Sequence, residues 1–232
     1  MRNVVVASAV RTAIGTFGGT LRDYPSIDLM GLVVREAVAR AGVAPETVGD
    51  VIVGQCMQRT DESPSGRLAA LKAGLPIEVP GLTIHRNWAS AMQSVIYGAQ
   101  QIMLGDMDVV VAGGVEVMSR VPYVLKDARW GKRLQHGVMS DGIWDGLTDP
   151  YCGLIMGLTA ENLAEKYSIS REEQDEVALR SHNNAEKATL SGLFKEEIVP
   201  VEIPQKKGNS VVFDKDEHYR PGMTMDQLSK LK

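Results

Sequence analysis

The feature that most constrains the fold is the alternation of short apolar runs with longer amphipathic segments. Apolar, largely β-branched runs occupy residues 51–53, 82–84 and 109–112, and helical patterns lie between them over residues 64–73 and 89–104. Strands that alternate with helices at this spacing are typical of βαβ units, in which crossover helices join parallel strands. The sequence therefore predicts an α/β core with a sheet covered by helices.

Two further elements are predicted near the N-terminus. Residues 4–9 are a short apolar run, followed by a Gly-rich loop over residues 11–19, and this pattern indicates a buried strand and a turn. Ser26 is a capping residue for a helix that extends to about residue 41, where Gly42 stops it. Both elements extend the α/β pattern.

The pattern changes in the second half of the chain. Residues 119–158 are rich in Gly, Trp, Asp and Arg and show no clear hydrophobic period. Ser170 and Glu173 form a capping box that opens a helix, which ends near residue 190 before Gly192. A more helical region is therefore expected after the irregular one.

Two short strand-like runs follow, over residues 198–203 and 210–213, joined by a turn at residues 207–208. They do not continue the βαβ pattern of the first half. We therefore predict two domains, an incomplete core over residues 1–118 and an inserted loop domain over residues 119–232.

The segment over residues 84–95 combines a strand end, a sharp turn and a helix start. A helix N-terminus presents unpaired N–H groups and a partial positive charge, which together stabilise a thiolate or an oxyanion. This geometry is typical of a mounted nucleophile, yet Trp88 occupies the position. An indole has one N–H donor and no nucleophilic lone pair, so the turn lacks a reactive atom.

Composition and charge exclude several classes of protein. The 232 residues carry a formal net charge of −4, and the basic residues are scattered, which argues against a nucleic-acid partner. Two cysteines are too few for a disulfide framework, and no Cys or His spacing is typical of a metal site. No stretch approaches the roughly 20 apolar residues that span a bilayer. We expect a cytoplasmic protein without a membrane partner, a metal or a resident cofactor.

A family resemblance that covers essentially the whole chain is carried by five blocks of the sequence, residues 4–12, 66–76, 112–119, 156–162 and 170–175. They resemble successive blocks of the thiolases, the acetyl-CoA acetyltransferases and 3-ketoacyl-CoA thiolases. The resemblance implies a thiolase-like layered α/β core, with a mixed sheet covered by helices and an inserted loop domain that docks coenzyme A. The substrate or ligand would be a coenzyme A thioester.

The nucleophile segment departs from the family. The family pattern Asn-Arg-x-Cys-Ala-Ser-Gly-Met-Gln falls on residues 85–93, so Trp88 stands where Cys is expected. His85 replaces the family Asn and Ala91 replaces the family Gly. The indole is far larger than a thiol and is expected to fill the space of an acyl group.

The resemblance also assigns substrate-binding positions. Met156 matches the Met that lines the acyl pocket, but Ile155 stands where the family usually has His. Lys206 and Lys207 match a basic family segment near the nucleotide of coenzyme A. Attraction to phosphates and a solvated turn are equally open interpretations of these two lysines.

Four other side chains are candidates to replace the missing thiol. Ser90 lies roughly 200° around the helix from Trp88, so its hydroxyl is expected to point away and make a capping or buried hydrogen bond. A structural role is favoured for His85 over that of a rescue base. Cys56 is interpreted as a small core residue. Cys152 is the better candidate for a reactive thiol, although a lone Cys without a visible base stays largely protonated.

The last residues, 216–232, match the end of the family's loop domain, so the chain is interpreted as truncated. The remaining half of a thiolase would carry an Asn-Glu segment, a Gly-His-Pro histidine and a second Cys. The leading hypothesis is an acyl-CoA acyltransferase homologue of the acetyl-CoA C-acyltransferase type, inactive alone. The alternatives are a non-catalytic binding or scaffold subunit of a heteromeric thiolase-like assembly and a decayed gene product. An open sheet edge would favour a homo-oligomer or a complementary thiolase-like chain as partner.

Overall fold

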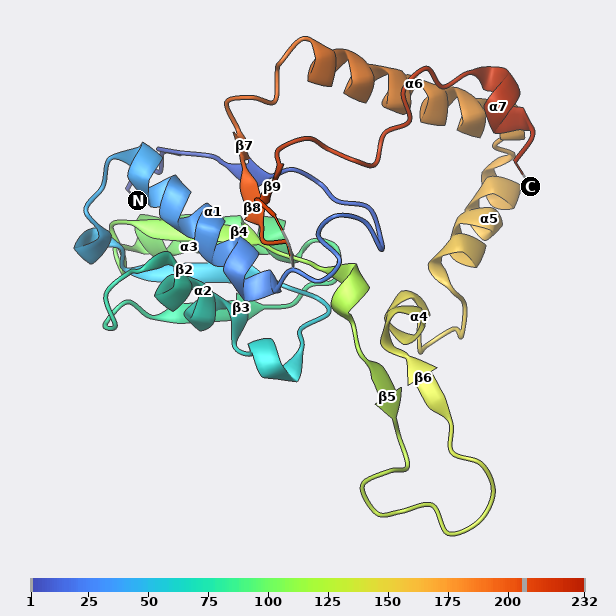
Figure 1. The fold of residues 1–232 in the computed structure, drawn as a ribbon, viewed down its shortest axis with the longest axis horizontal. Coiled ribbons are helices and arrows are strands. Elements are labelled where there is room, and N and C mark those ends of the chain that lie inside the picture. The colour runs from blue at the N-terminus through green and yellow to red at the C-terminus, as the bar shows by residue number, and fades with distance from the viewer. Residues whose placement is uncertain (1, 206–207, 232) are drawn as a thin grey trace. The chain divides into compact units, whose positions relative to one another are not determined.

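The computed structural model describes residues 2–205 and 208–231. The chain divides into two compact units, each with its own secondary structure (Figure 1). The first unit comprises Met1–Arg120 and Lys195–Glu217, and the second comprises Val121–Phe194 and His218–Lys232. The division into a core domain and a loop domain between residues 118 and 119 stays a prediction.

A three-stranded parallel sheet lies at the centre of the first unit. The middle strand β2 (Asp50–Gly54) pairs on one side with β3 (Gly81–Ile84) and on the other with β4 (Val110–Gly114). In this register, Ile52 lies beside Leu82 and Ala112. Every residue of β2 is buried, as the apolar run predicted for a strand covered on both faces. The predicted parallel sheet is confirmed.

Three helices cover this sheet. The helices are α1 (Ser26–Ala41), α2 (Ser65–Ala73) and α3 (Ser90–Leu104). Each ends at a glycine in the left-handed conformation, where a side chain would be strained, and the ends predicted at Gly42 and Gly74 are confirmed. Short 3-10 turns, η1 (Pro45–Thr47), η2 (Thr60–Glu62) and η3 (Met118–Arg120), complete the connections.

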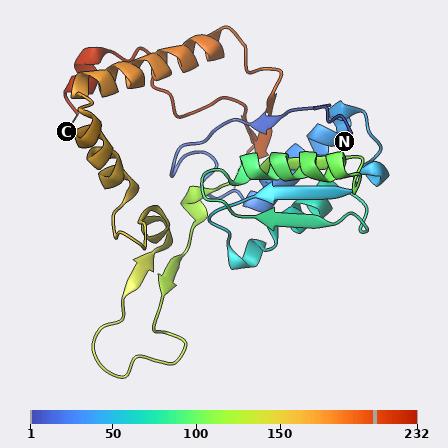
Figure 2. The same cartoon turned by 180° about the vertical axis from the view of Figure 1, so that it is seen from behind.

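The helices lie on opposite faces of the sheet. Val51 and Val53 join one hydrophobic cluster with side chains of α1 and α2. Side chains alternate along a strand, so Ile52 points to the other face, where α3 lies (Figure 2). The result is a three-layer α/β/α arrangement. The loops that follow the three strands all begin at the carboxyl edge of the sheet.

The buried strand predicted over residues 4–9 is wrong. The first strand is β1 (Arg11–Thr12), and residues 2–10 form no strand, with Val5 82% exposed. Apolar β-branched residues favour a strand only where a neighbouring strand accepts their hydrogen bonds, and no described strand pairs with this run. Instead, β1 pairs in parallel with β7 (Ile198–Val199).

The strand-like runs near the end of the chain belong to the first unit. After β7 come β8 (Val201–Ile203) and β9 (Val211–Phe213), which pair antiparallel. Val201 and Phe213 are buried in a second cluster with Ala13, Leu21 and Leu29. The hairpin is confirmed, although its first run is divided between β7 and β8. Of its predicted turn, residue 207 lies outside the described residues.

The second unit combines a hairpin with helices. Strands β5 (Tyr123–Leu125) and β6 (Met139–Asp141) pair antiparallel. The predicted capping box at Ser170 and Glu173 and the predicted end of its helix at residue 190 are confirmed. No described helix is both long enough and apolar enough to cross a membrane. The helices are α4 (Gly142–Leu147), α5 (Met156–Tyr167), α6 (Arg171–Leu190) and α7 (Met225–Ser229).

Candidate functional site

The candidate site is the turn between β3 and α3, at the carboxyl edge of the parallel sheet. Open α/β sheets bind ligands at this edge, because the loops after neighbouring strands meet there. Asn87, in the centre of the turn, has a left-handed backbone with φ 47°. The carbonyl of Arg86 accepts the Ala89 N–H at 3.1 Å, and the carbonyl of Asn87 accepts the Ser90 N–H at 3.0 Å. These bonds make the turn a tight one.

Ser90 is a structural residue of the turn. Its side chain is buried, with the whole residue 3% exposed. Its Oγ accepts the Arg86 N–H at 2.8 Å and donates to the carbonyl of Asn87 at 2.5 Å. The predicted buried hydrogen bond is confirmed, and this hydroxyl is occupied on both its donor and its acceptor side.

Two glycines allow the start of α3 to pack closely against the ends of the strands. A Cβ on Gly54 would overlap the backbone of Ser90, and a Cβ on Gly114 would lie 2.6 Å from the Cβ of Ala91. Ser94, one turn further, donates from Oγ to the carbonyl of Gly113 at 2.7 Å. The helix start is therefore fixed against the ends of both β2 and β4.

Trp88 itself projects from this rigid turn. The residue is 73% exposed, so the described part of the first unit does not bury the indole. The idea that the indole fills the space of an acyl group stays a prediction. Residue 88 lies between Asn87, whose backbone is left-handed, and the first turn of α3.

His85 takes part in the turn as an acceptor. Its Nδ1 accepts the Asn87 N–H at 3.3 Å. A ring nitrogen used in this way supports the structural role favoured by the sequence.

The interpretation of Cys56 as a core residue is wrong. Cys56 is only partly buried, and its Sγ donates to the carbonyl of Asn87 at 2.7 Å and lies 3.4 Å from the Oγ of Ser90. The thiol leaves the core because β2 ends at Gly54 and the next residues turn along the edge of the sheet. Cys56 is thus a member of the candidate site.

Glu116 is a site residue that sequence reasoning missed. Its two carboxylate oxygens accept the backbone N–H groups of Cys56, at 2.9 Å, and Met57, at 3.0 Å. Burial raises the pKa of Glu116, although these two bonds and His85 oppose the shift. The available signal was its place four residues after the end of the strand predicted over residues 109–112, at the edge where the other site residues lie.

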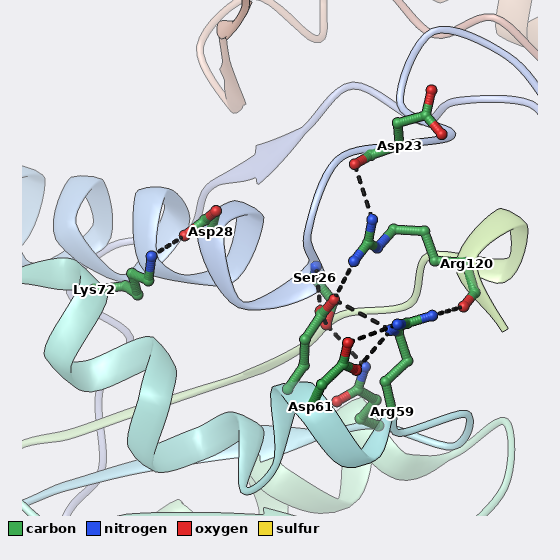
Figure 3. A network of polar contacts seen from close by, with 9 residues as sticks. Asp23, Ser26, Asp28, Arg59, Asp61, Lys72 and Arg120 are labelled. Atoms are coloured by element: carbon green, nitrogen blue, oxygen red, sulfur yellow. Dashed lines mark hydrogen bonds and ion pairs between the residues drawn. The ribbon is translucent and has the colours of Figure 1, made fainter. Parts of the chain in front are cut away.

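A network of ion pairs and hydrogen bonds around the buried Glu62 joins the start of α1 to η2 and η3 (Figure 3). Glu62 accepts the N–H of Ser26 at 2.8 Å and its hydroxyl at 2.5 Å, and receives the Nη2 of Arg120 at 2.7 Å. Burial opposes ionisation, but these bonds lower the pKa of Glu62. Arg59 adds a bond to the carbonyl of Arg120 at 2.6 Å. The side-chain cap predicted for Ser26 is wrong, because its hydroxyl binds Glu62 instead.

The remaining sequence-predicted residues lie in the second unit or outside the described residues. Cys152 is exposed, and its Sγ lies 3.2 Å from the Oδ2 of Asp149, whereas reactive thiolates are typically found beside cations. Met156 is the first residue of α5 and is 44% exposed. Lys206 and Lys207 lie outside the described residues. Their substrate-binding roles stay predictions.

Comparison with known proteins identifies the family. The model of the family described as "Thiolase, N-terminal domain" matches residues 4–232. The beta-ketothiolase BktB of Cupriavidus necator is 47% identical, and an acetyl-CoA acetyltransferase of the same organism is 48% identical. Each alignment covers 100% of this chain and 59% of the relative. The chain therefore spans about three fifths of the length of these relatives.

Solved structures agree with this result. The acetyl-CoA acetyltransferase of Bacillus anthracis matches with a TM-score of 0.97 and 53% identity, over 100% of this chain and 59% of the other. The human mitochondrial 3-ketoacyl-CoA thiolase in complex with CoA matches with a TM-score of 0.91 and 39% identity, over 97% and 56%. The predicted thiolase-like fold is confirmed. This chain belongs to the thiolase family and corresponds to the N-terminal part of its members.

Proposed function

We propose that this chain is an acyl-CoA acyltransferase homologue, of the acetyl-CoA C-acyltransferase type, that carries no covalent acyl group at the turn after β3. The observation behind this proposal is Trp88 at the position that resembles the family nucleophile. Thiolytic cleavage and condensation need a thiolate that accepts the acyl group. An indole cannot form that thioester, whatever other segments complete the protein.

No neighbouring group in the turn is free to take over this role. The hydroxyl of Ser90 is buried and hydrogen-bonded on both sides. The thiol of Cys56 is directed at the carbonyl of Asn87. His85 uses its Nδ1 as an acceptor within the turn. Each side chain holds the backbone of the turn, so we propose that the chain is inactive alone.

Binding of coenzyme A is a separate matter from acyl transfer. The human relative is known in complex with CoA, and this chain matches that structure over 97% of its length. We propose Met156, Lys206 and Lys207 as substrate-binding residues, with the two lysines attracting phosphate groups. Such a protein would bind a coenzyme A thioester and release it unchanged.

Mass spectrometry after incubation with acetyl-CoA tests the absence of acyl transfer. We expect no acetyl group on the peptide that contains Trp88, and coenzyme A binding that is measurable by calorimetry. The Trp88→Cys variant is the control, because alkylation of its new thiol by iodoacetamide shows that the position is accessible. An acetyl adduct on the unmodified chain, on Cys56 or elsewhere in the turn, would overturn the proposal.

A non-catalytic binding or scaffold subunit of a heteromeric thiolase-like assembly is the second candidate function. It is favoured by an exposed apolar stripe on α3, in which Val95 and Ile96 lie three and four residues after Met92. Beside it, β3 forms an edge of the three-stranded sheet. Exposed apolar patches and open sheet edges mark contacts with other chains.

Sedimentation tests this second candidate. We expect either a homo-oligomer or a complex with a complementary thiolase-like chain that copurifies. Replacing Ile96 by Lys should weaken the association, whereas replacing Glu46 in η1 by Lys should leave it unchanged. A concentration-independent monomer that copurifies with no thiolase-like chain would contradict the scaffold role.

A further inference from the structure

The turn that carries Trp88 stores backbone strain at Asn87. This residue adopts φ 47°, in the left-handed region, which Asn enters more readily than most residues other than Gly but still at a conformational cost. Such conformations persist only where surrounding contacts over-determine them, and they cluster at functional sites. The contacts that hold Asn87 are therefore informative about how the site is built.

Three donors converge on the carbonyl oxygen of Asn87. Two come from Ser90, which is part of the same turn: its N–H at 3.0 Å and its Oγ at 2.5 Å. The third is the Sγ of Cys56, at 2.7 Å, which reaches the turn from the loop after β2. Among the described contacts of this carbonyl, only the thiol ties the turn to another part of the sheet edge.

Cys56 is itself held in place by a carboxylate from the loop after β4. Glu116 accepts the N–H of Cys56 on one oxygen and the N–H of Met57 on the other. Two bonds from adjacent N–H groups to one carboxylate fix both the position and the direction of the backbone. A chain of contacts thus runs from Glu116 through Cys56 to Asn87 and joins the loops after all three strands.

We propose that Cys56, supported by Glu116, is a positioning residue that holds Asn87 in its left-handed conformation and so fixes the backbone at residue 88. The proposal rests on the proposed function in one respect: it treats residue 88 as the position of the family nucleophile. Cys56 acts here as a hydrogen-bond donor, and its sulfur forms no covalent bond.

Amide hydrogen exchange, measured by NMR on the whole chain, tests this role. The N–H groups of Ala89 and Ser90 are bonded inside the turn, so their exchange rates report its opening. We expect Cys56→Ala to accelerate their exchange about fivefold, since one hydrogen bond is lost. Cys56→Ser keeps a donor and should stay within about twofold of the natural chain. Cys152→Ala is the matched control and should change neither amide.

Glu116→Gln tests the support behind Cys56. The Gln side chain keeps one acceptor oxygen where Glu116 has two. We therefore expect the exchange of the Ala89 and Ser90 amides to be faster than in Cys56→Ser and slower than in Cys56→Ala. No effect of this variant would remove Glu116 from the proposal.

The exchange of β2 amides separates positioning from general stability. In a positioning role, Cys56→Ala accelerates the turn and leaves the Val51 and Val53 amides unchanged. Equal acceleration in both places, or none in the turn, would overturn the proposal, as would a failure of Cys56→Ser to rescue. Because no acyl-CoA is present, these outcomes are independent of whether the chain transfers acyl groups.

Discussion

The two units of the chain differ in how much apolar surface each buries. In the first unit, buried side chains from α1, β2 and α2 form a continuous core. In the second, the buried apolar side chains among the described residues are Met223 and Leu228. Its helices α6 and α7 instead begin with complete capping boxes. Since buried apolar area is the main source of stability, the global free energy of unfolding should reside in the first unit, and local contacts should govern the second.

The largest effect is expected for Ile52→Ala in β2. This side chain is fully buried in the centre of the sheet, so its removal leaves a cavity and should lower the free energy of unfolding by about 2–5 kcal/mol. Urea unfolding followed by circular dichroism measures the change. The matched variant Leu163→Ala, on an exposed face of α5, should cost less than about 0.5 kcal/mol. Equal losses would show that the two units do not differ in this way.

A smaller loss is expected for Glu62→Gln. The change keeps the shape of the side chain but removes the charge that faces the guanidinium of Arg120 in the buried network. We expect the free energy of unfolding to fall by about 2 kcal/mol. The control is Asp61→Asn, because Asp61 pairs with Arg59 in a largely exposed position and its loss should cost clearly less than that of Glu62→Gln. A cost for Asp61→Asn as large as that of Glu62→Gln would argue against the importance of burial.

The pH dependence of the free energy of unfolding should also arise mainly from titratable groups of the first unit. Burial opposes ionisation of Glu62, Asp216 and Glu217, but hydrogen bonds lower the pKa of each in the folded chain. Their contribution is therefore complete above the ordinary values of 3.8 for Asp and 4.5 for Glu, and is lost as pH falls through the lower folded-state values. Glu116 acts in the opposite sense, because its raised pKa makes its contribution complete below 4.5 and lost as pH rises through the folded-state value.

In the first unit, the hydrogen bond to Arg59 also lowers the pKa of Asp61. Four lowered carboxyl groups against one raised group predict a net loss of stability in acid. The urea midpoint should fall when the pH is reduced from neutral to below 3.8. Asp216→Asn should flatten this dependence, since Asp216 pairs with Arg11 and accepts the Ile14 N–H. A urea midpoint that rises in acid would contradict the dominance of the groups with a lowered pKa and would point to Glu116 as the dominant group.

The sequence predicted the central elements of the first unit because local signals and the tertiary structure agree there. The run over residues 51–53 is apolar on both faces, and glycines at 42 and 74 end the helices where a left-handed residue is needed. The run over residues 4–9 shows the limit of this reasoning. Its composition favours burial, but a strand also needs a neighbour, which composition does not report.

The sequence predicted where the candidate site lies but not all the residues that form it. The turn at Trp88 follows from a strand end and a helix start that are adjacent in the sequence. The roles of Cys56 and Glu116 depend instead on hydrogen bonds between loops that lie about 30 and 60 residues apart. Such contacts arise from the order of strands in the sheet, β3-β2-β4, and this order differs from the order along the chain.

The smallest effect is expected at the start of α6 in the second unit. Ser170 accepts the Glu173 N–H at 3.2 Å, and the Glu173 carboxylate accepts the Ser170 N–H at 2.8 Å. Ser170→Ala breaks the first bond and should destabilise the first turn of the helix by about 1 kcal/mol. Faster amide exchange confined to that turn, with β2 unchanged, is the expected result. Ser191→Ala, at the other end of α6, should change little, because the Ser191 N–H still bonds to the carbonyl of Lys187. Exchange that also accelerates in β2 would mean that the second unit contributes to global stability and that the contrast in burial does not divide the chain.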